Sequence, residues 1–223
     1  MNLDFYNHDF FFICYPLGSG GQHFGNLVSL DRSFCPVGYD SHNDYIVAVN
    51  SEYDNISRKD AHVALSKSIE IFKTEKFLKN LSLIGNNYNK SIWPMHLSYL
   101  NCFDDDGMLF KSMRKKRMIV FTFRTELSRN FLKVRLSKLI GKTIDNDMFA
   151  WGIFDTQIFY SREYIMKTFD FKDQDIYEIE ISQLFNENIS HLLADLNKSF
   201  DLNIPLMESE ALHRKWLKNI VKL

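Results

Sequence analysis

DFFFICYPLGSGGQHF, residues 9–24, places an almost wholly apolar run directly before a cluster of glycines. The segment Asp9–Tyr15, apolar from Phe10 onward, predicts a strand that is buried on both faces, as in a parallel sheet. Apolar residues at helical spacing after Gly21 predict a helix that starts near Gln22. Glycines let the backbone approach a ligand closely, and the amide groups at a helix start attract an anion. The stretch therefore predicts a phosphate-binding loop.

Two familiar nucleotide-binding motifs do not fit this loop. The triphosphate loop GxxxxGK[ST] needs a lysine that reaches the outer phosphates, whereas Gly21 is followed by Gln22 and His23. The dinucleotide fingerprint GxGxxG starts at Gly18 but has His23 where its third glycine belongs. Kinase or ATPase chemistry is therefore disfavoured. A glycine-rich turn that binds no ligand remains an alternative.

The rest of the chain alternates apolar runs with amphipathic segments, a pattern typical of a parallel sheet flanked by helices. Further strands are predicted near residues 45–49, 117–123 and 176–181 and within 91–100, and helices over 59–81, 124–139, 189–200 and 208–221. Loops are expected at 104–106 and 145–154. No repeat or linker divides the chain, so we expect a single domain over residues 1–223. Its expected fold class is α/β, a three-layer sandwich with a mainly parallel sheet.

Composition narrows the classes of function. The 223 residues carry a net charge of −1, so no basic field favours nucleic acid or an anionic membrane as a partner. The first apolar run is too short for a membrane span or a signal sequence, and a cytoplasmic location is expected. Cys14, Cys35 and Cys102 form no CxxC pair, and no HExxH motif occurs, so neither a disulfide framework nor a metal site is predicted.

FFICYPLGSGGQHFGNLVSL, residues 11–30, resembles the first strand, loop and helix of the sulfotransferase superfamily, especially its small, divergent bacterial and viral members. In that family an aromatic residue and a proline precede the loop, as Tyr15 and Pro16 do here. The family has a P-loop-type fold and uses 3′-phosphoadenosine 5′-phosphosulfate (PAPS) as co-substrate. The resemblance implies transfer of a sulfuryl group from PAPS to a hydroxyl or amine of a small molecule or sugar.

The resemblance also implies roles for individual residues. The contacts to the 5′-phosphosulfate would come from Gly18, Ser19, Gly20, Gly21, Gln22, His23 and Phe24. Arg124, which follows the apolar run MIVFTF, would hold the 3′-phosphate. Ser128 is the candidate for the helix serine that assists it, because Leu132 stands where the family usually has that serine. His96, in the segment IWPMH, corresponds to the base that takes the acceptor's proton.

One position of the loop departs from the family pattern. The family's lysine, which stabilises the bridging oxygen as the sulfate leaves, is replaced by Leu17. Either another cation, such as His23 or Arg32, supplies that charge, or the activity is weak or lost. The alternative function is therefore a nucleotide- or phosphate-binding protein without catalysis, such as a viral structural component that reuses the fold. Near the C-terminus, His213 and Trp216 are expected to pack the last helix.

Overall fold

The computed structural model of the chain describes residues 8–16, 18–34, 38–40, 45–47, 90–96, 108–141, 143 and 161–221. Within these ranges a few side chains are not described, among them those of Gln22 and His96. Leu17, the predicted helix 59–81 and the predicted loops at 104–106 and 145–154 lie outside the described residues.

Four strands form one parallel sheet in the order β4-β1-β5-β6. They are β1 (Asp9–Tyr15), β4 (Lys90–His96), β5 (Lys115–Thr122) and β6 (Ile176–Glu180). β1 is buried along its whole length between β4 and β5, which confirms the doubly buried strand expected from its sequence. The next strand of this sheet along the chain, β4, lies on one side of β1, and the strand after it, β5, lies on the other side of β1. Ligands of open α/β sheets bind at such a reversal, beyond the carboxyl ends of the strands.

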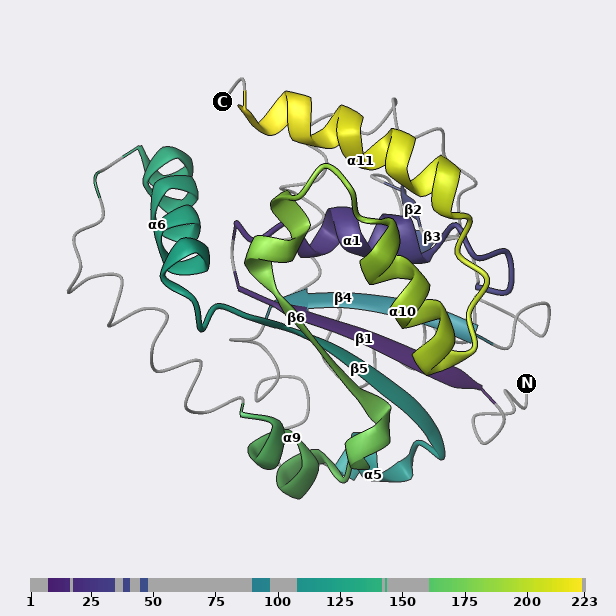
Figure 1. Cartoon of the computed structure of the whole chain (residues 1–223). Helices are drawn as coiled ribbons and strands as arrows, with labels where there is room; N and C mark the ends of the chain where they lie inside the picture. Colours follow the sequence, from purple (N-terminus) through teal and green to yellow (C-terminus); the bar gives the residue numbers. More distant parts are fainter. Residues whose placement is uncertain are drawn as a thin grey trace.

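Helices cover both faces of this sheet (Figure 1). One face carries α1 (Gly21–Val28), α10 (Ser190–Phe200) and α11 (Leu206–Val221), and the other carries α5 (Met108–Ser112) and α9 (Arg162–Phe169). The side chains of β1 alternate between the two cores, with Phe11 and Ile13 in one and Phe12 and Cys14 in the other. Because β1 lies between two apolar layers, neither of its faces is polar. The parallel sheet with helices on both faces makes the architecture α/β, as expected.

The helix α6 (Glu126–Ile140) follows β5 and begins two residues later than predicted. Thr125 is its N-cap, and the Thr125 hydroxyl oxygen accepts a hydrogen bond of 3.2 Å from the amide of Ser128. Gly141 ends the helix with a φ of 70°, which a glycine adopts without strain. Leu132, which stands where the resemblance would place a serine, is fully buried in the core cluster that also contains residues of α1.

The remaining described elements are short. β2 (Gly38–Asp40) and β3 (Tyr45–Val47) form an antiparallel pair of their own, and η5 (Asp173–Asp175) and η6 (Ile181–Phe185) are 3₁₀ turns on either side of β6. The strand predicted near residues 45–49 therefore exists, but it pairs outside the parallel sheet. Within the part of the chain that the structure describes, no helix combines the length and apolar character that crossing a membrane requires.

Candidate functional site

Three segments with predicted site residues meet at the carboxyl edge of the sheet. The glycine loop leaves β1 after Tyr15, and β4 ends at His96, whose backbone pairs with Tyr15. Arg124 lies just beyond the end of β5, the neighbour of β1 on the other side. Because neighbouring strands are about 4.8 Å apart, these segments lie close together despite their separation in sequence. The side chain of His96 lies outside the described part of the structure.

A tight turn opens the glycine loop. The amide of Ser19 donates to the carbonyl of Pro16 at 3.2 Å, and the hydroxyl of Ser19 donates to the same oxygen at 2.7 Å. Gly18, the third residue of the turn, has a φ of 81°, which favours glycine. Ser19 is fully buried, so its hydroxyl supports the turn and faces the protein.

The N-cap residue of α1 makes no side-chain hydrogen bond to the start of the helix. This residue is Gly20, with a φ of 83°. The first N–H groups of a helix have no acceptor within the helix, and the helix dipole adds about half a positive charge there. The amide of Phe24 closes the first turn by donating to the carbonyl of Gly20 at 3.0 Å, and the Phe24 ring lies in the core. The attraction that a helix start exerts on an anion would therefore come here from backbone groups before Phe24.

Two aromatic rings of the protein pack against the loop glycines. A Cβ atom at Gly20 would lie 2.7 Å from the ring of Trp216, which belongs to α11. A Cβ atom at Gly21 would lie 2.0 Å from Cγ of Tyr15. Both distances are far shorter than van der Waals contact. Packing inside the protein therefore requires glycine at these two positions, whether or not a ligand also approaches them.

His23 is buried against α11 and is hydrogen-bonded to a second histidine. Its Nε2 lies 3.1 Å from Nδ1 of His213, and its ring stacks on Trp216 with centroids 4.2 Å apart. Nε2 of His213 lies 3.0 Å from the carbonyl oxygen of Asn186. Because a carbonyl only accepts, this nitrogen carries the proton, and Nδ1 of the neutral ring accepts from His23. The expectation that His213 and Trp216 pack the last helix is confirmed.

Both rings of this histidine pair favour the neutral form. Burial lowers the pKa of His23 well below its usual value, and the charge of His213 would lower it further. Burial also lowers the pKa of His213, although backbone hydrogen bonds and the nearby Glu210 oppose that shift. A neutral imidazole carries no positive charge, so the surroundings of His23 do not favour the cationic role that the resemblance left open for it.

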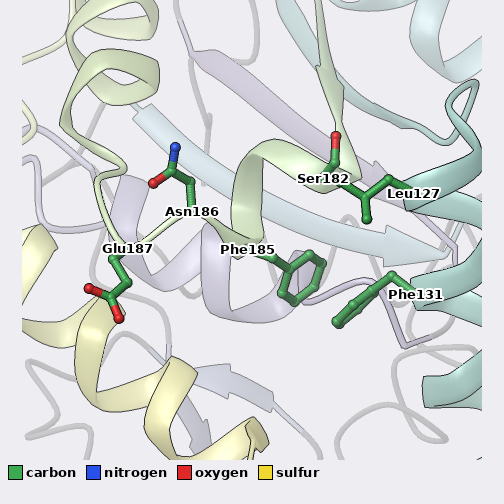
Figure 2. A pocket seen from close by; sticks show the side chains of 6 residues that line it. All are labelled: Leu127, Phe131, Ser182, Phe185, Asn186 and Glu187. Atoms are coloured by element: carbon green, nitrogen blue, oxygen red, sulfur yellow. The ribbon is translucent and has the colours of Figure 1, made fainter.

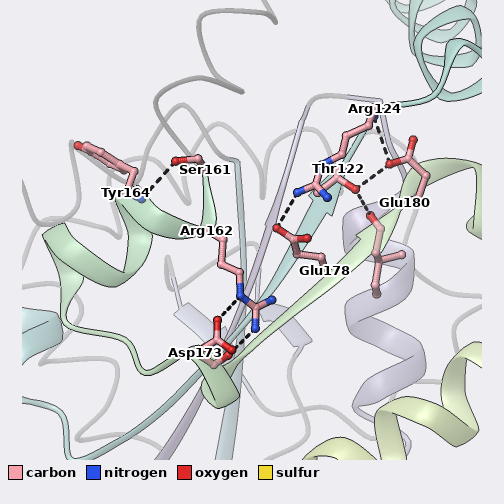
Figure 3. Close-up of polar contacts among 9 residues, drawn as sticks. Thr122, Arg124, Ser161, Arg162, Tyr164, Asp173, Glu178 and Glu180 are labelled. Atoms are coloured by element: carbon pink, nitrogen blue, oxygen red, sulfur yellow. Dashed lines mark hydrogen bonds and ion pairs between the residues drawn. The ribbon is translucent and has the colours of Figure 1, made fainter.

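Arg124 is paired with a carboxylate of the neighbouring strand. Its Nη2 donates to Oε1 of Glu178 at 2.8 Å (Figure 3). The Arg124 side chain is 65% exposed and that of Glu178, a residue of β6, only 23%, so the arginine is the more solvent-exposed partner of the pair. The residue predicted to bind a phosphate therefore already holds an anionic group of the protein.

The carboxylate of Glu180 accepts several hydrogen bonds near the start of α6. Its Oε2 accepts from the hydroxyl of Thr122 at 2.7 Å and from the amide of Arg124 at 3.2 Å (Figure 3), and Oε1 accepts from the amide of Thr125 at 3.0 Å. Burial alone would raise the pKa of Glu180, but these donors and the Ser128 hydroxyl outweigh burial and hold the pKa below its usual value. The carboxylate thus occupies an anion-binding helix start.

Ser128, the predicted partner of Arg124, is fully buried in this network. Its hydroxyl oxygen accepts from the amide of Ser182 at 3.0 Å and lies 3.0 Å from the hydroxyl oxygen of Thr125. The structure therefore brings Ser128 and Arg124 to the same helix start but engages both with groups of the protein. Sequence reasoning missed Glu178 and Glu180, although the acidic residues alternating with apolar ones in IYEIEI were a signal for them.

An open groove lies between α6 and η6. Its lining residues are Leu127, Phe131, Ser182, Phe185, Asn186 and Glu187 (Figure 2). The rings of Phe131 and Phe185 lie with centroids 3.3 Å apart, and Phe185 in turn stacks near Trp216 at 5.8 Å. Aromatic rings therefore connect the groove to the glycine loop, although no residue of Gly18–Phe24 lines it.

The described residues contain no group of three or more His, Cys, Asp or Glu side chains placed to hold a metal ion.

Comparison of the whole chain with models of protein families and with curated proteins finds no match. The geometry of the described residues and the resemblance of residues 11–30 are therefore the basis for a functional proposal.

Proposed function

We propose that this chain is a sulfotransferase-like protein of the P-loop type that transfers a sulfuryl group from PAPS to a hydroxyl or amine of a small molecule or sugar. One observation carries the proposal. The glycine loop, His96 and Arg124 belong to separate segments that meet at the carboxyl edge of one parallel sheet, around the central strand β1. The resemblance of residues 11–30 suggests the identity of the co-substrate.

The proposed roles follow from this arrangement. Backbone amides at the start of α1 hold the 5′-phosphosulfate, and Arg124 holds the 3′-phosphate once its guanidinium leaves Glu178. The acceptor's oxygen or nitrogen attacks sulfur, the bond between sulfur and the bridging oxygen breaks, and His96 takes the acceptor's proton. The products are the sulfated acceptor and 3′-phosphoadenosine 5′-phosphate (PAP). The start of α1 stabilises the charge that develops on the leaving phosphate.

Nucleotide binding provides the first test. PAP at about one hundred times its dissociation constant should stabilise the protein by about 2.7 kcal/mol, which raises the melting temperature by roughly 5–10 °C. Differential scanning fluorimetry measures the shift, and labelled PAPS with a panel of hydroxyl and amine acceptors measures turnover. Stabilisation by ATP with Mg²⁺ and not by PAP would contradict the proposal and favour kinase-type chemistry.

The role of Arg124 gives a second test. Arg124→Ala should weaken the binding of PAP about tenfold and leave that of AMP unchanged, because a guanidinium makes charge-assisted hydrogen bonds to the 3′-phosphate alone. Isothermal titration calorimetry with both nucleotides measures the ratio of affinities. Arg162→Ala is the matched control, since Arg162 is paired with Asp173 at the opposite end of β6. An unchanged preference for PAP in Arg124→Ala would show that the assignment of Arg124 is wrong.

The second candidate is a nucleotide- or phosphate-binding protein without catalysis. Specific observations favour it: Glu178 and Glu180 already engage Arg124, and Trp216 packs against Gly20. The neutral His23 also does not supply the charge of the family's lysine. Binding of PAP without turnover of PAPS across the acceptor panel would support this candidate over the transferase.

A further inference from the structure

We infer that Glu178 is an internal competitor for the ligand's 3′-phosphate and sets how strongly the site prefers a nucleotide that carries one. The inference rests on the proposed function, because it concerns a nucleotide held by the glycine loop and Arg124. It adds a specificity-determining residue that touches Arg124 and not the reacting atoms.

The geometry of the Arg124–Glu178 pair permits an exchange of partners. The two side chains are joined at 2.8 Å, and within the described residues Arg124 is the one partner found for the side chain of Glu178. The backbone amide of Arg124 is held separately by Glu180 at 3.2 Å. The guanidinium, which is 65% exposed, can therefore turn from the carboxylate to a phosphate in solvent without moving the backbone.

Glu180 cannot make the same exchange. Its carboxylate accepts from the hydroxyl of Thr122 and from the amide of Thr125, and a capping box joins it to Gln183 at the start of η6. Releasing it would leave several donors without an acceptor, each at a considerable cost. Glu180 therefore stays in place, and Glu178 is the carboxylate that a phosphate displaces.

The local charge balance gives Glu178 its influence. Glu178 and Glu180 are two residues apart on β6, so both side chains lie on the same face of the sheet. A 3′-phosphate that approaches Arg124 meets the carboxylates of Glu178 and Glu180 beside the guanidinium, and it must also break the existing ion pair. Neutralising Glu178 removes the competitor and one repulsive charge, whereas a nucleotide without the 3′-phosphate gains nothing from that change.

The test compares PAP with AMP as probes in calorimetric titrations at low salt. Glu178→Gln keeps the shape of the side chain and should tighten the binding of PAP about two- to fivefold, the range expected from the loss of one exposed ion pair, with AMP unchanged. The gain should shrink as salt is added, because salt screens exposed charges. Glu178→Asp, which keeps the charge but shortens the side chain, is a second variant that should also favour PAP.

Matched variants separate the inference from a general charge effect. Glu208→Gln, on the exposed first turn of α11, should leave the ratio of PAP to AMP affinity unchanged, and Glu178→Gln added to Arg124→Ala should bring no gain. Unchanged or weaker PAP binding in both Glu178 variants, with wild-type binding intact, would overturn the role of Glu178 alone. If neither nucleotide binds any variant or the wild type, the proposed function fails, and this inference fails with it.

Discussion

Replacing Gly21 by alanine should destabilise the protein by at least about 3 kcal/mol, a loss of roughly 6–12 °C in melting temperature. The added Cβ would lie 2.0 Å from Cγ and 2.6 Å from Cβ of Tyr15. The Cβ of Tyr15 cannot swing aside, because it is attached to the backbone of the fully buried strand β1. The substitution must therefore shift either the strand or the start of α1. Thermal unfolding followed by circular dichroism measures the loss.

Gly141→Ala is the control for this substitution. Gly141 has a φ of 70°, and no atom of the residues that the structure describes lies within 4 Å of the position of an added Cβ. Alanine there costs about 1 kcal/mol, because an ordinary residue is strained at positive φ. If Gly21→Ala lowers the free energy of unfolding no more than Gly141→Ala does, the close packing of Tyr15 against Gly21 in the structure is wrong.

Lowering the pH should destabilise the protein already in the range above the pKa values that carboxyl groups have in an unfolded chain. Burial lowers the pKa of His8 from 6.5 to about 4, and it also lowers the pKa values of His23 and His213. The unfolded chain then binds more protons than the folded protein, so the stability from these neutral rings is complete above pH 6.5 and decreases as the pH falls. For His8 the decrease continues to about pH 4. Between pH 7.5 and pH 5, His8 alone should account for about 1 to 2 kcal/mol.

Urea unfolding at a series of pH values measures this dependence. The His8→Asn variant should lose less stability than the wild type between pH 7.5 and pH 5, because its side chain takes up no proton there. His191→Asn, on the exposed surface of α10, is the matched control and should keep the wild-type profile. Burial raises the pKa of Asp9, so protonation of that carboxyl offsets part of the loss at lower pH. A wild-type stability that stays level from pH 7.5 to pH 5 would show that these rings are not held neutral.

Much of the fold could be predicted from local patterns. The strand Asp9–Tyr15 has the predicted bounds, α1 begins within one residue of its expected start, and α10 and α11 lie where their apolar periodicity placed them. Such patterns reveal which residues face an apolar layer, because burial repeats with the period of the strand or helix. The helices α5 and α9 were missed because both are short and offer few turns over which a helical period can be recognised.

The composition and order of residues along the chain therefore specify the parallel sheet, the glycine loop after its central strand, and the attraction of a helix start for anions. Only the packed structure specifies the neighbours of that loop and of Arg124. His23 meets His213 across 190 positions, and Arg124 meets Glu178 across 54. The physical reason is that periodicity reports the environment of a side chain but not its partner. Which groups come within hydrogen-bonding distance depends on how distant segments pack.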